Sequence, residues 1–339
     1  MNAAGNKAAH REPVLRTIAY VAVMLYCIGR AQYGHAQEFS LAGGSSRAGS
    51  HNTYAWAFEY QEGIGEYFAG SFMWLNEGHV PDHHRDGQAV QLWARLPLVR
   101  RQFVISAGVG PYRYFDTTVA DLGGSYSNDH GWGVLYSLRA QYYASDRWIA
   151  QLQLNRVHVQ RGPDATAIML GVGYQLDAPN GAGPRQWAVG RSNNVTNNEV
   201  TAYIGKTILN SNESQSATGG AVDYRVGLLK YLDLTVGYLH EGKTSKARRD
   251  GLTSQLWATR AFFSDTVTLG FGAGVYYALS EYDNSASSGP GKHQFSGLIS
   301  ITGAYRFTKH WAARLTWNRV VTRYDRDTDV ILAGIGYRW

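Results

Sequence analysis

Five side chains that could bind a metal ion lie within eight residues of one another: His79, Asp82, His83, His84 and Asp86. Neutral imidazole nitrogens and carboxylate oxygens are ligands for zinc, copper or nickel. We therefore predict a metal site at His79, Asp82, His83 and His84. The spacing matches no ordered ligand set, so the alternative is a local embellishment of a polar loop.

A second group could catalyse acyl transfer. Ser127 and His130 flank an Asn-Asp pair in a polar segment, and a hydroxyl or imidazole beside a carboxylate can cleave an ester. Neither residue lies in a nucleophile motif. We therefore assign no catalytic residue and no cofactor, and keep an acyl hydrolase acting on lipid A as an alternative function.

An internal repeat shows which residues are shared by both halves of the chain. Glu77-Gly78, Arg85-Asp86-Gly87 and Gln91-Leu92-Trp93-Ala94 return 164 positions later as Glu241-Gly242, Arg249-Asp250-Gly251 and Gln255-Leu256-Trp257-Ala258. Such a constant offset indicates duplication. The second copy has lysine and arginine instead of the histidines, so the shared acidic and arginine residues are interpreted as structural.

The elements that position these residues have a period of two. In 165–177, large apolar residues alternate with small or polar ones, which is typical of strands. Sixteen such segments are expected, each of about the 9 to 11 residues that cross a membrane as a tilted strand, or a little longer. They are 38–47, 54–62, 66–76, 87–97, 102–113, 132–144, 148–158, 165–177, 198–209, 220–228, 231–240, 251–261, 266–278, 293–306, 310–321 and 328–339.

The first 36 residues have the pattern of a signal peptide, with a basic start, an apolar run over 17–28 and a small-x-small site at 34–36. Cys27 lies in this segment, so the exported chain is expected to contain no cysteine. Removing four basic residues and one acidic one lowers the formal charge from +6 to +3. That charge gives no electrostatic reason to expect a nucleic-acid partner.

Short turns alternate with longer polar connections, and the chain ends in Gly336-Tyr337-Arg338-Trp339. This layout and the aromatic last residue resemble Gram-negative outer-membrane β-barrels. The resemblance implies insertion by the barrel-assembly machinery. It also implies an outer-membrane location with extracellular long loops and periplasmic termini, and contact with outer-membrane lipid and lipopolysaccharide. Arg156 and Arg319, near the outer ends of corresponding strands, are candidates for that contact.

The fold class is all-β, an antiparallel up-and-down barrel built from two repeats, 37–177 and 198–339, joined by a periplasmic linker at 178–197. We expect one sixteen-stranded barrel on base rate. The alternative is two eight-stranded barrels, which close around side chains rather than water. Inward-facing Trp93 and Trp257 opposite Gly-x-Gly segments favour that alternative.

A single wide barrel would be a pore or export conduit of unknown solute, whereas two filled barrels would indicate a structural or adhesion protein. In either case one network of lumen or rim residues is expected. It comprises Glu77, Arg85, Asp86, Gln91, Trp93, Asn155, Glu241, Arg249, Asp250, Gln255, Trp257 and Asn318.

Overall fold

The computed structural model describes residues 37–339, except for 81, 119–125, 145, 177–180, 185–197, 212–213, 245–246 and 284–294. The predicted signal peptide lies outside the described residues, as does most of the predicted linker. Within the described part of the chain, no helix is long and apolar enough to cross a membrane.

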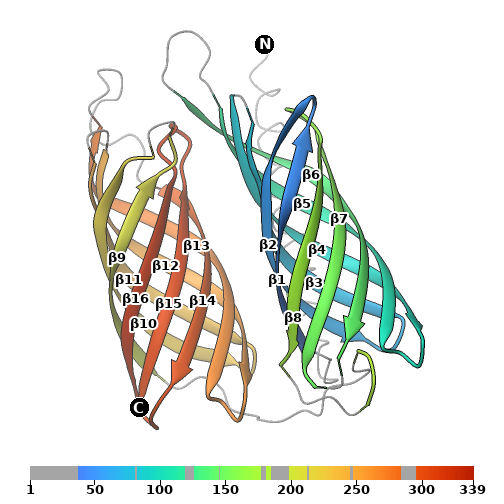
Figure 1. Cartoon of the computed structure of the whole chain (residues 1–339). Helices are drawn as coiled ribbons and strands as arrows, with labels where there is room; N and C mark the ends of the chain where they lie inside the picture. Colours follow the sequence, from blue (N-terminus) through green and yellow to red (C-terminus); the bar gives the residue numbers. More distant parts are fainter. Residues whose placement is uncertain are drawn as a thin grey trace, which may run out of the picture.

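The chain forms two separate antiparallel barrels that stand side by side (Figure 1). In the first barrel, β1 pairs with both β2 and β8, which closes the sheet. Its strands are β1 (Gln37–Ala48), β2 (His51–Ile64), β3 (Phe68–Val80), β4 (His83–Leu98), β5 (Phe103–Thr118), β6 (Ser127–Tyr143), β7 (Trp148–Val159) and β8 (Ala165–Gln175).

The second barrel closes in the same way, because β9 pairs with both β10 and β16. Its strands are β9 (Glu199–Leu209), β10 (Ser216–Leu229), β11 (Leu232–Lys243), β12 (Ala247–Phe262), β13 (Val267–Asp283), β14 (Phe295–Arg306), β15 (Trp311–Val321) and β16 (Thr328–Arg338). The sixteen predicted strands are confirmed. The single sixteen-stranded ring is not formed, and the two-barrel alternative is.

The strands extend further at one end of each barrel than the sequence pattern predicted. Residues 77–86, expected as a loop, continue the β3–β4 ladder to a turn at Asp82, whose φ is +66°. Above the apolar zone a hairpin still pairs its backbone groups, but its side chains no longer alternate between apolar and polar. Period-two analysis therefore stops short of the strand ends.

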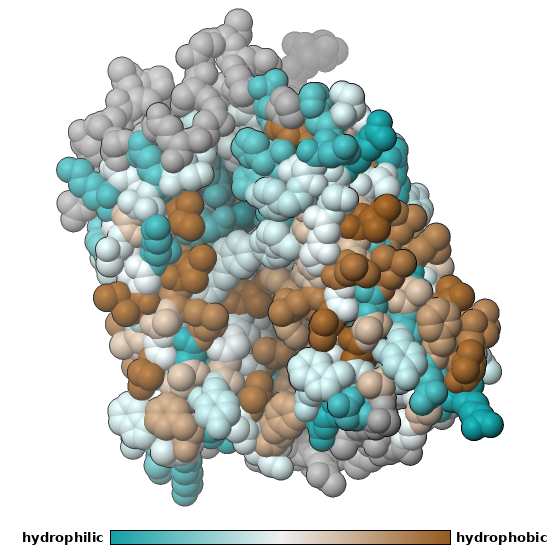
Figure 2. Space-filling model, viewed as in Figure 1, coloured by the Kyte–Doolittle hydropathy of each residue, from teal (hydrophilic) through white to brown (hydrophobic). Residues whose placement is uncertain are grey.

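Apolar side chains cover the outside of both barrels. Leu92, Leu170 and Ile204 are more than half exposed, whereas Gln91, Met169 and Gly205 beside them face inward or pack against neighbouring strands. Figure 2 shows the result as a brown band across the middle of the molecule with hydrophilic ends. This is the distribution expected of a barrel surrounded by lipid.

A large aromatic residue fills each lumen at corresponding levels. Trp93 and Trp257 are fully buried, and a Cβ atom added at Gly108 or Gly272 would lie only 2.6–2.7 Å from the indole ring. Only glycine leaves room for these rings. The inward Trp opposite a glycine is therefore a packing feature of a filled eight-stranded barrel.

This contact predicts that substituting different glycines will have very different effects on stability. We expect Gly108→Ala to lower the free energy of unfolding by about 1–3 kcal/mol, because the methyl group displaces Trp93. Gly303→Ala is the control: its Cβ would face outward and meet only Leu269, at 3.7 Å. Urea unfolding in detergent micelles measures both. Equal effects from the two substitutions would contradict the packing.

Candidate functional site: two sealed lumens and the seam between the barrels

The first lumen is closed by a charged cluster around Arg139, on β6. Its guanidinium pairs with Glu59, donates to Gln61 at 2.8 Å and to Gln153 at 3.0 Å, and lies 3.9 Å from the centre of the Trp93 ring. All five side chains are buried. Strands β2, β4, β6 and β7 each contribute to this cluster, so it spans the barrel from wall to wall.

The predicted lumen residues of the first barrel join the same layer. Gln91 donates to Ser137 Oγ at 3.0 Å, and Ser137 donates to Asn155 Oδ1 at 2.6 Å. The indole N–H of Trp93 donates to Ser71 Oγ at 2.8 Å. These polar groups therefore form hydrogen bonds with one another inside the lumen. In a water-filled pore they would be hydrated instead.

Above this layer, the predicted rim pair forms one of two matching clusters. Arg85 donates to both carboxylate oxygens of Glu77, at 2.8 and 2.7 Å, and the Tyr112 hydroxyl donates to the same carboxylate at 2.8 Å. In the second barrel, Arg249 donates to Glu241 at 2.7 Å. The adjacent Gly78 and Gly242 have φ of +83° and +76° at matching irregularities of β3 and β11.

The second lumen uses different charges. Arg314 donates to Glu199 at 2.7 and 3.1 Å, and Arg225 donates to Asp233 at 3.3 Å while its guanidinium lies 4.6 Å from the centre of the Trp257 ring. Trp257 in turn donates to Thr235 at 2.8 Å. The predicted residues Gln255 and Asn318 are buried in this lumen, and Asn318 accepts a hydrogen bond from Ser300 at 2.6 Å.

Asp86 is the predicted rim residue that belongs to neither lumen. It points out of the first barrel and accepts a hydrogen bond from Arg319 of the second barrel at 2.6 Å. Arg319 also donates to both oxygens of Asp329, at 2.8 and 2.7 Å. Arg319 is only 4% exposed, so the predicted lipopolysaccharide contact at this residue is excluded by the neighbouring barrel.

Aromatic rings surround this ion cluster and form a seam between the barrels. Trp74 and Trp317 stack with ring centroids 4.2 Å apart, and each indole N–H donates to one of the aspartates that bind Arg319. Lower in the seam, Phe72 and Phe271 approach to 4.4 Å. Stacked or tilted aromatic pairs at these distances stabilise an interface beyond the area they bury.

A second ion pair crosses the seam nearer the end with the short turns. Arg260 donates to Glu62 at 2.7 and 3.1 Å. The repeat places Val226 at the position of Glu62 and Leu96 at the position of Arg260. Leu96 is 56% exposed on the outside of the first barrel. The two copies therefore carry charge at these outward positions only where the other barrel covers them.

The extended β5–β6 hairpin leans toward the second barrel and ties the two rims together (Figure 1). His130 Nε2 lies 2.6 Å from Asp327 Oδ2, while the Asn128 backbone N–H and the Ser127 hydroxyl donate to Asp325 at 2.7 and 3.2 Å. Within the described residues, no hydrogen bond joins Ser127 to His130. Ser127 and His130 are three residues apart on one strand, so their side chains point to opposite faces of it. They also bind different carboxylates, so this arrangement joins the two barrels and does not form a catalytic triad.

The predicted metal cluster does not converge. His83 Nδ1 lies 2.8 Å from Asp116, and the rings of His79 and His84 pack against each other at 5.4 Å. Asp82 occupies the turn. Among the described residues, no group of three histidine, cysteine, aspartate or glutamate side chains is placed to hold a metal ion. The geometry gives no support to the metal prediction.

The last two predicted residues lie at the rims, where Arg156 is exposed and Asp250 is buried. Arg156, whose side chain is 52% exposed, donates to Asp164 at 2.9 Å. Slight burial opposes the charge of Asp164, but hydrogen bonds from His158 and Val159 outweigh it and lower the pKa of that carboxyl. Asp250, the counterpart of Asp86, pairs with His240 of its own barrel. Arg156 stays a predicted lipopolysaccharide contact.

The sequence reasoning missed the seam. Its signal was present in the outward positions at which the copies differ: Glu62 against Val226, Arg260 against Leu96, and Trp317 against Leu154. An arginine or lysine on the lipid-facing side of a barrel costs about 2–4 kcal/mol at the midplane and about 0–1 kcal/mol near the interfaces. An outward position that is charged or aromatic in one copy and aliphatic in the other is therefore a candidate for contact with protein, and finding such positions requires the repeat register.

No protein-family model and no curated protein matches the sequence. Among solved structures, the chain is similar to the N-terminal β-barrel domain of Pseudomonas aeruginosa OprF, with 11% identity, 41% of this chain and 98% of that chain covered, and a TM-score of 0.34. It is also similar to Ail, the attachment invasion locus protein of Yersinia pestis, at 10% identity, 42% and 97% coverage and a TM-score of 0.33. A third neighbour, the CymD monoaromatic hydrocarbon channel, has 10% identity, 91% and 90% coverage and a TM-score of 0.25.

The fold is that of an outer-membrane β-barrel. The resemblance predicted from the sequence is confirmed at this level by the two closed antiparallel sheets and their apolar outer surface. At these identities and TM-scores the comparisons carry no argument about function. The function has to be inferred from this chain's own lumens and seam.

Proposed function

We propose that this protein is a non-conducting structural protein of the outer membrane, in which two sealed barrels are clamped into one unit that presents a joined extracellular rim. The observation that carries the proposal is the Arg139 cluster together with its counterpart around Arg314, since each fills its lumen with paired charges. A structural or adhesion role was the alternative attached to two filled barrels in the sequence interpretation.

The pore hypothesis depended on one wide ring lined by polar residues. Glu77, Gln91 and Asn155 would have been its lining, yet each is at most 5% exposed. Eight strands enclose an interior that side chains can fill. A conduit through either barrel would require several buried ion pairs to separate at once, each at a cost of several kcal/mol.

The proposal includes an orientation. The long hairpins β3–β4 and β5–β6 would be extracellular, and the short turns and the carboxyl terminus periplasmic, as in other barrels of this class. The aromatic end at Tyr337 and Trp339 supports recognition by the barrel-assembly machinery. Arg156 and its exposed neighbours would lie at the level of lipopolysaccharide phosphates.

Conductance tests the sealed lumens. We expect purified full-length protein in planar bilayers to produce no stepwise current at voltages where a wide porin, added as a positive control, conducts. Incorporation is verified independently by protease protection of liposomes prepared from the same sample. Regular current steps that scale with protein concentration would refute the sealed-lumen proposal and restore the conduit.

A further inference from the structure

The second barrel contains a cavity of about 60 Å³ at the end with the short turns. A buried water requires roughly 10–15 Å³, so this space would hold about four to six waters. A phosphate or a single carboxylate group is of this size, whereas a whole sugar is not. Residues of three turns, including Lys230, Asp265 and His310, surround its mouth.

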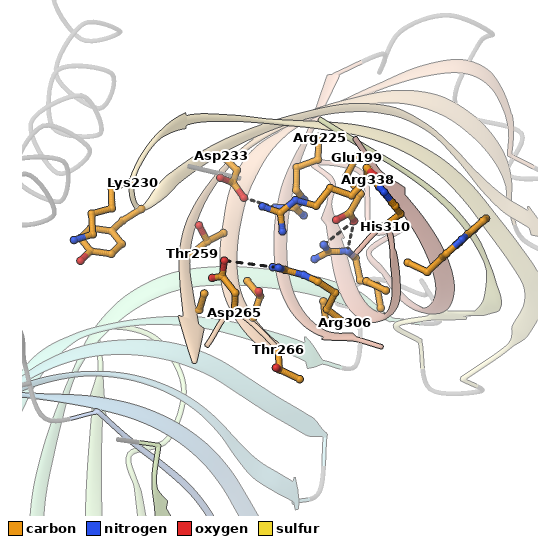
Figure 3. Close-up of a pocket in the computed structure, with 17 residues that line it drawn as sticks. Glu199, Arg225, Lys230, Asp233, Thr259, Asp265, Thr266, Arg306, His310 and Arg338 are labelled. Atoms are coloured by element: carbon orange, nitrogen blue, oxygen red, sulfur yellow. Dashed lines mark hydrogen bonds and ion pairs between the residues drawn. The ribbon is translucent and has the colours of Figure 1, made fainter. Parts of the chain in front are cut away.

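Positive charge exceeds negative charge around this cavity. Its walls carry Arg225, Arg306, Arg314, Arg338 and Lys230, against three carboxylates. Figure 3 shows labelled arginine and acidic side chains projecting into the ring of strands. The carboxylates are already engaged: Glu199 by Arg314 at 2.7 Å, Asp233 by Arg225 at 3.3 Å and Asp265 by Arg306 at 3.7 Å.

Two cations are left over after this pairing, Lys230 in a turn at the mouth and Arg338 on β16. The side chain of Arg338 makes no hydrogen bond and no ion pair with any residue that the structure describes, and its Nε atom is buried without an acceptor. A buried guanidinium N–H without a partner is costly, because burial removes the hydrogen bonds it would make to water. The Arg306 pair, at 3.7 Å, is long enough that its guanidinium can also turn toward another acceptor.

The first barrel provides an internal comparison. At the positions of Arg225, Arg306, Arg314 and Arg338 it carries Gln61, Tyr143, Gln151 and Gln175. Gln175 donates to the Gly183 carbonyl at 3.2 Å, and Arg101 donates to the Pro184 carbonyl at 2.6 Å, so the 181–184 segment lies against that mouth. The four arginines are specific to the second barrel.

We propose that the mouth of the second barrel binds a small oxyanion, a phosphate or a carboxylate group, through Arg338 and Arg306. Guanidinium groups bind such anions with paired, charge-assisted hydrogen bonds. The ligand group would satisfy Arg338 Nε and balance the excess charge. With the orientation given under the proposed function, the mouth opens to the periplasm, and the group would belong to a periplasmic solute or polymer.

Titration calorimetry on the full chain in detergent micelles tests the site with two probes, inorganic phosphate and acetate, at constant ionic strength. We expect at least one of them to bind at millimolar or lower concentration. Heat with phosphate alone identifies a phosphate ligand, and heat with acetate identifies a carboxylate ligand. Silence with both probes overturns the proposal. Because the protein is in solution, the result does not depend on orientation or on conductance.

The substitutions are chosen from the other copy. Arg338→Gln introduces the residue found at Gln175, and we expect it to weaken binding about tenfold, the loss of one charge-assisted hydrogen bond. Arg306→Gln is a second, independent variant in case the first one misfolds. Lys309→Gln is the matched control, since Lys309 is an exposed cation of the adjacent turn that does not line the cavity. Equal weakening by Lys309→Gln would overturn the site and leave only nonspecific attraction.

Discussion

Replacing Arg319 with alanine is expected to lower the free energy of unfolding by about 3–5 kcal/mol, the usual effect of removing one partner from a buried ion cluster. Asp86 and Asp329 would be left facing each other in the seam without a cation. Their cost is raised by the surroundings, because Trp74 and Phe115 cover the guanidinium and exclude water. Urea unfolding followed by tryptophan fluorescence measures the change.

Arg156→Ala is the matched control for this substitution. Arg156 occupies the same position in the first repeat, pairs with Asp164, and is exposed. A solvated pair of this kind contributes at most about 1 kcal/mol. The near-ultraviolet circular dichroism of the stacked Trp74 and Trp317 rings gives a seam-specific signal that should fall in Arg319→Ala alone. If both variants lose the same stability and the dichroism is unchanged, the seam does not join the barrels.

The strands and the direction of their side chains could be predicted from sequence because alternation is local. In β8, Ile168, Leu170 and Val172 face out while Ala167 and Met169 face in. The type of each residue indicates which face of the strand it lies on. Barrel closure is not local. In a separate barrel Leu41 pairs with Val172 of β8, whereas in a single ring it would pair with a residue of β16. Both partners are more than a hundred residues away, and the period of two is the same in both cases.

The packing at Trp93 did contain information about closure. An indole ring that requires glycine opposite it is a sign of a narrow barrel, but the sequence interpretation gave this sign less weight than the base rate of single barrels. The seam escaped for another reason. Asp86 belongs to a motif shared by both copies, yet it pairs with Arg319 in one copy while Asp250 pairs with His240 in the other. The same residue type therefore acquires different partners from its tertiary surroundings.

The ion cluster of the first lumen gives the second large effect. We expect Arg139→Gln to cost about 3–5 kcal/mol or to prevent folding, because the Glu59 carboxyl would be left at a fully enclosed position with no cation beside it. The Trp93 ring would also lose the guanidinium that lies 3.9 Å above it. The shift between folded and unfolded bands on unheated gels gives a first measurement, and urea unfolding gives the free energy.

The double substitution Glu59→Gln with Arg139→Gln separates charge from packing. Replacing both partners of a buried ion pair with neutral groups of similar shape is often tolerated, whereas removing one is not. We therefore expect the double variant to be more stable than Arg139→Gln alone by about 2 kcal/mol or more, and to remain non-conducting because the lumen is still filled. A double variant as unstable as the single one would mean that Arg139 acts through its contact with Trp93 and the glutamines. The second barrel already fills the same level differently, with Thr302 at the position of Arg139, so a plugged lumen of this width does not depend on one particular ion pair.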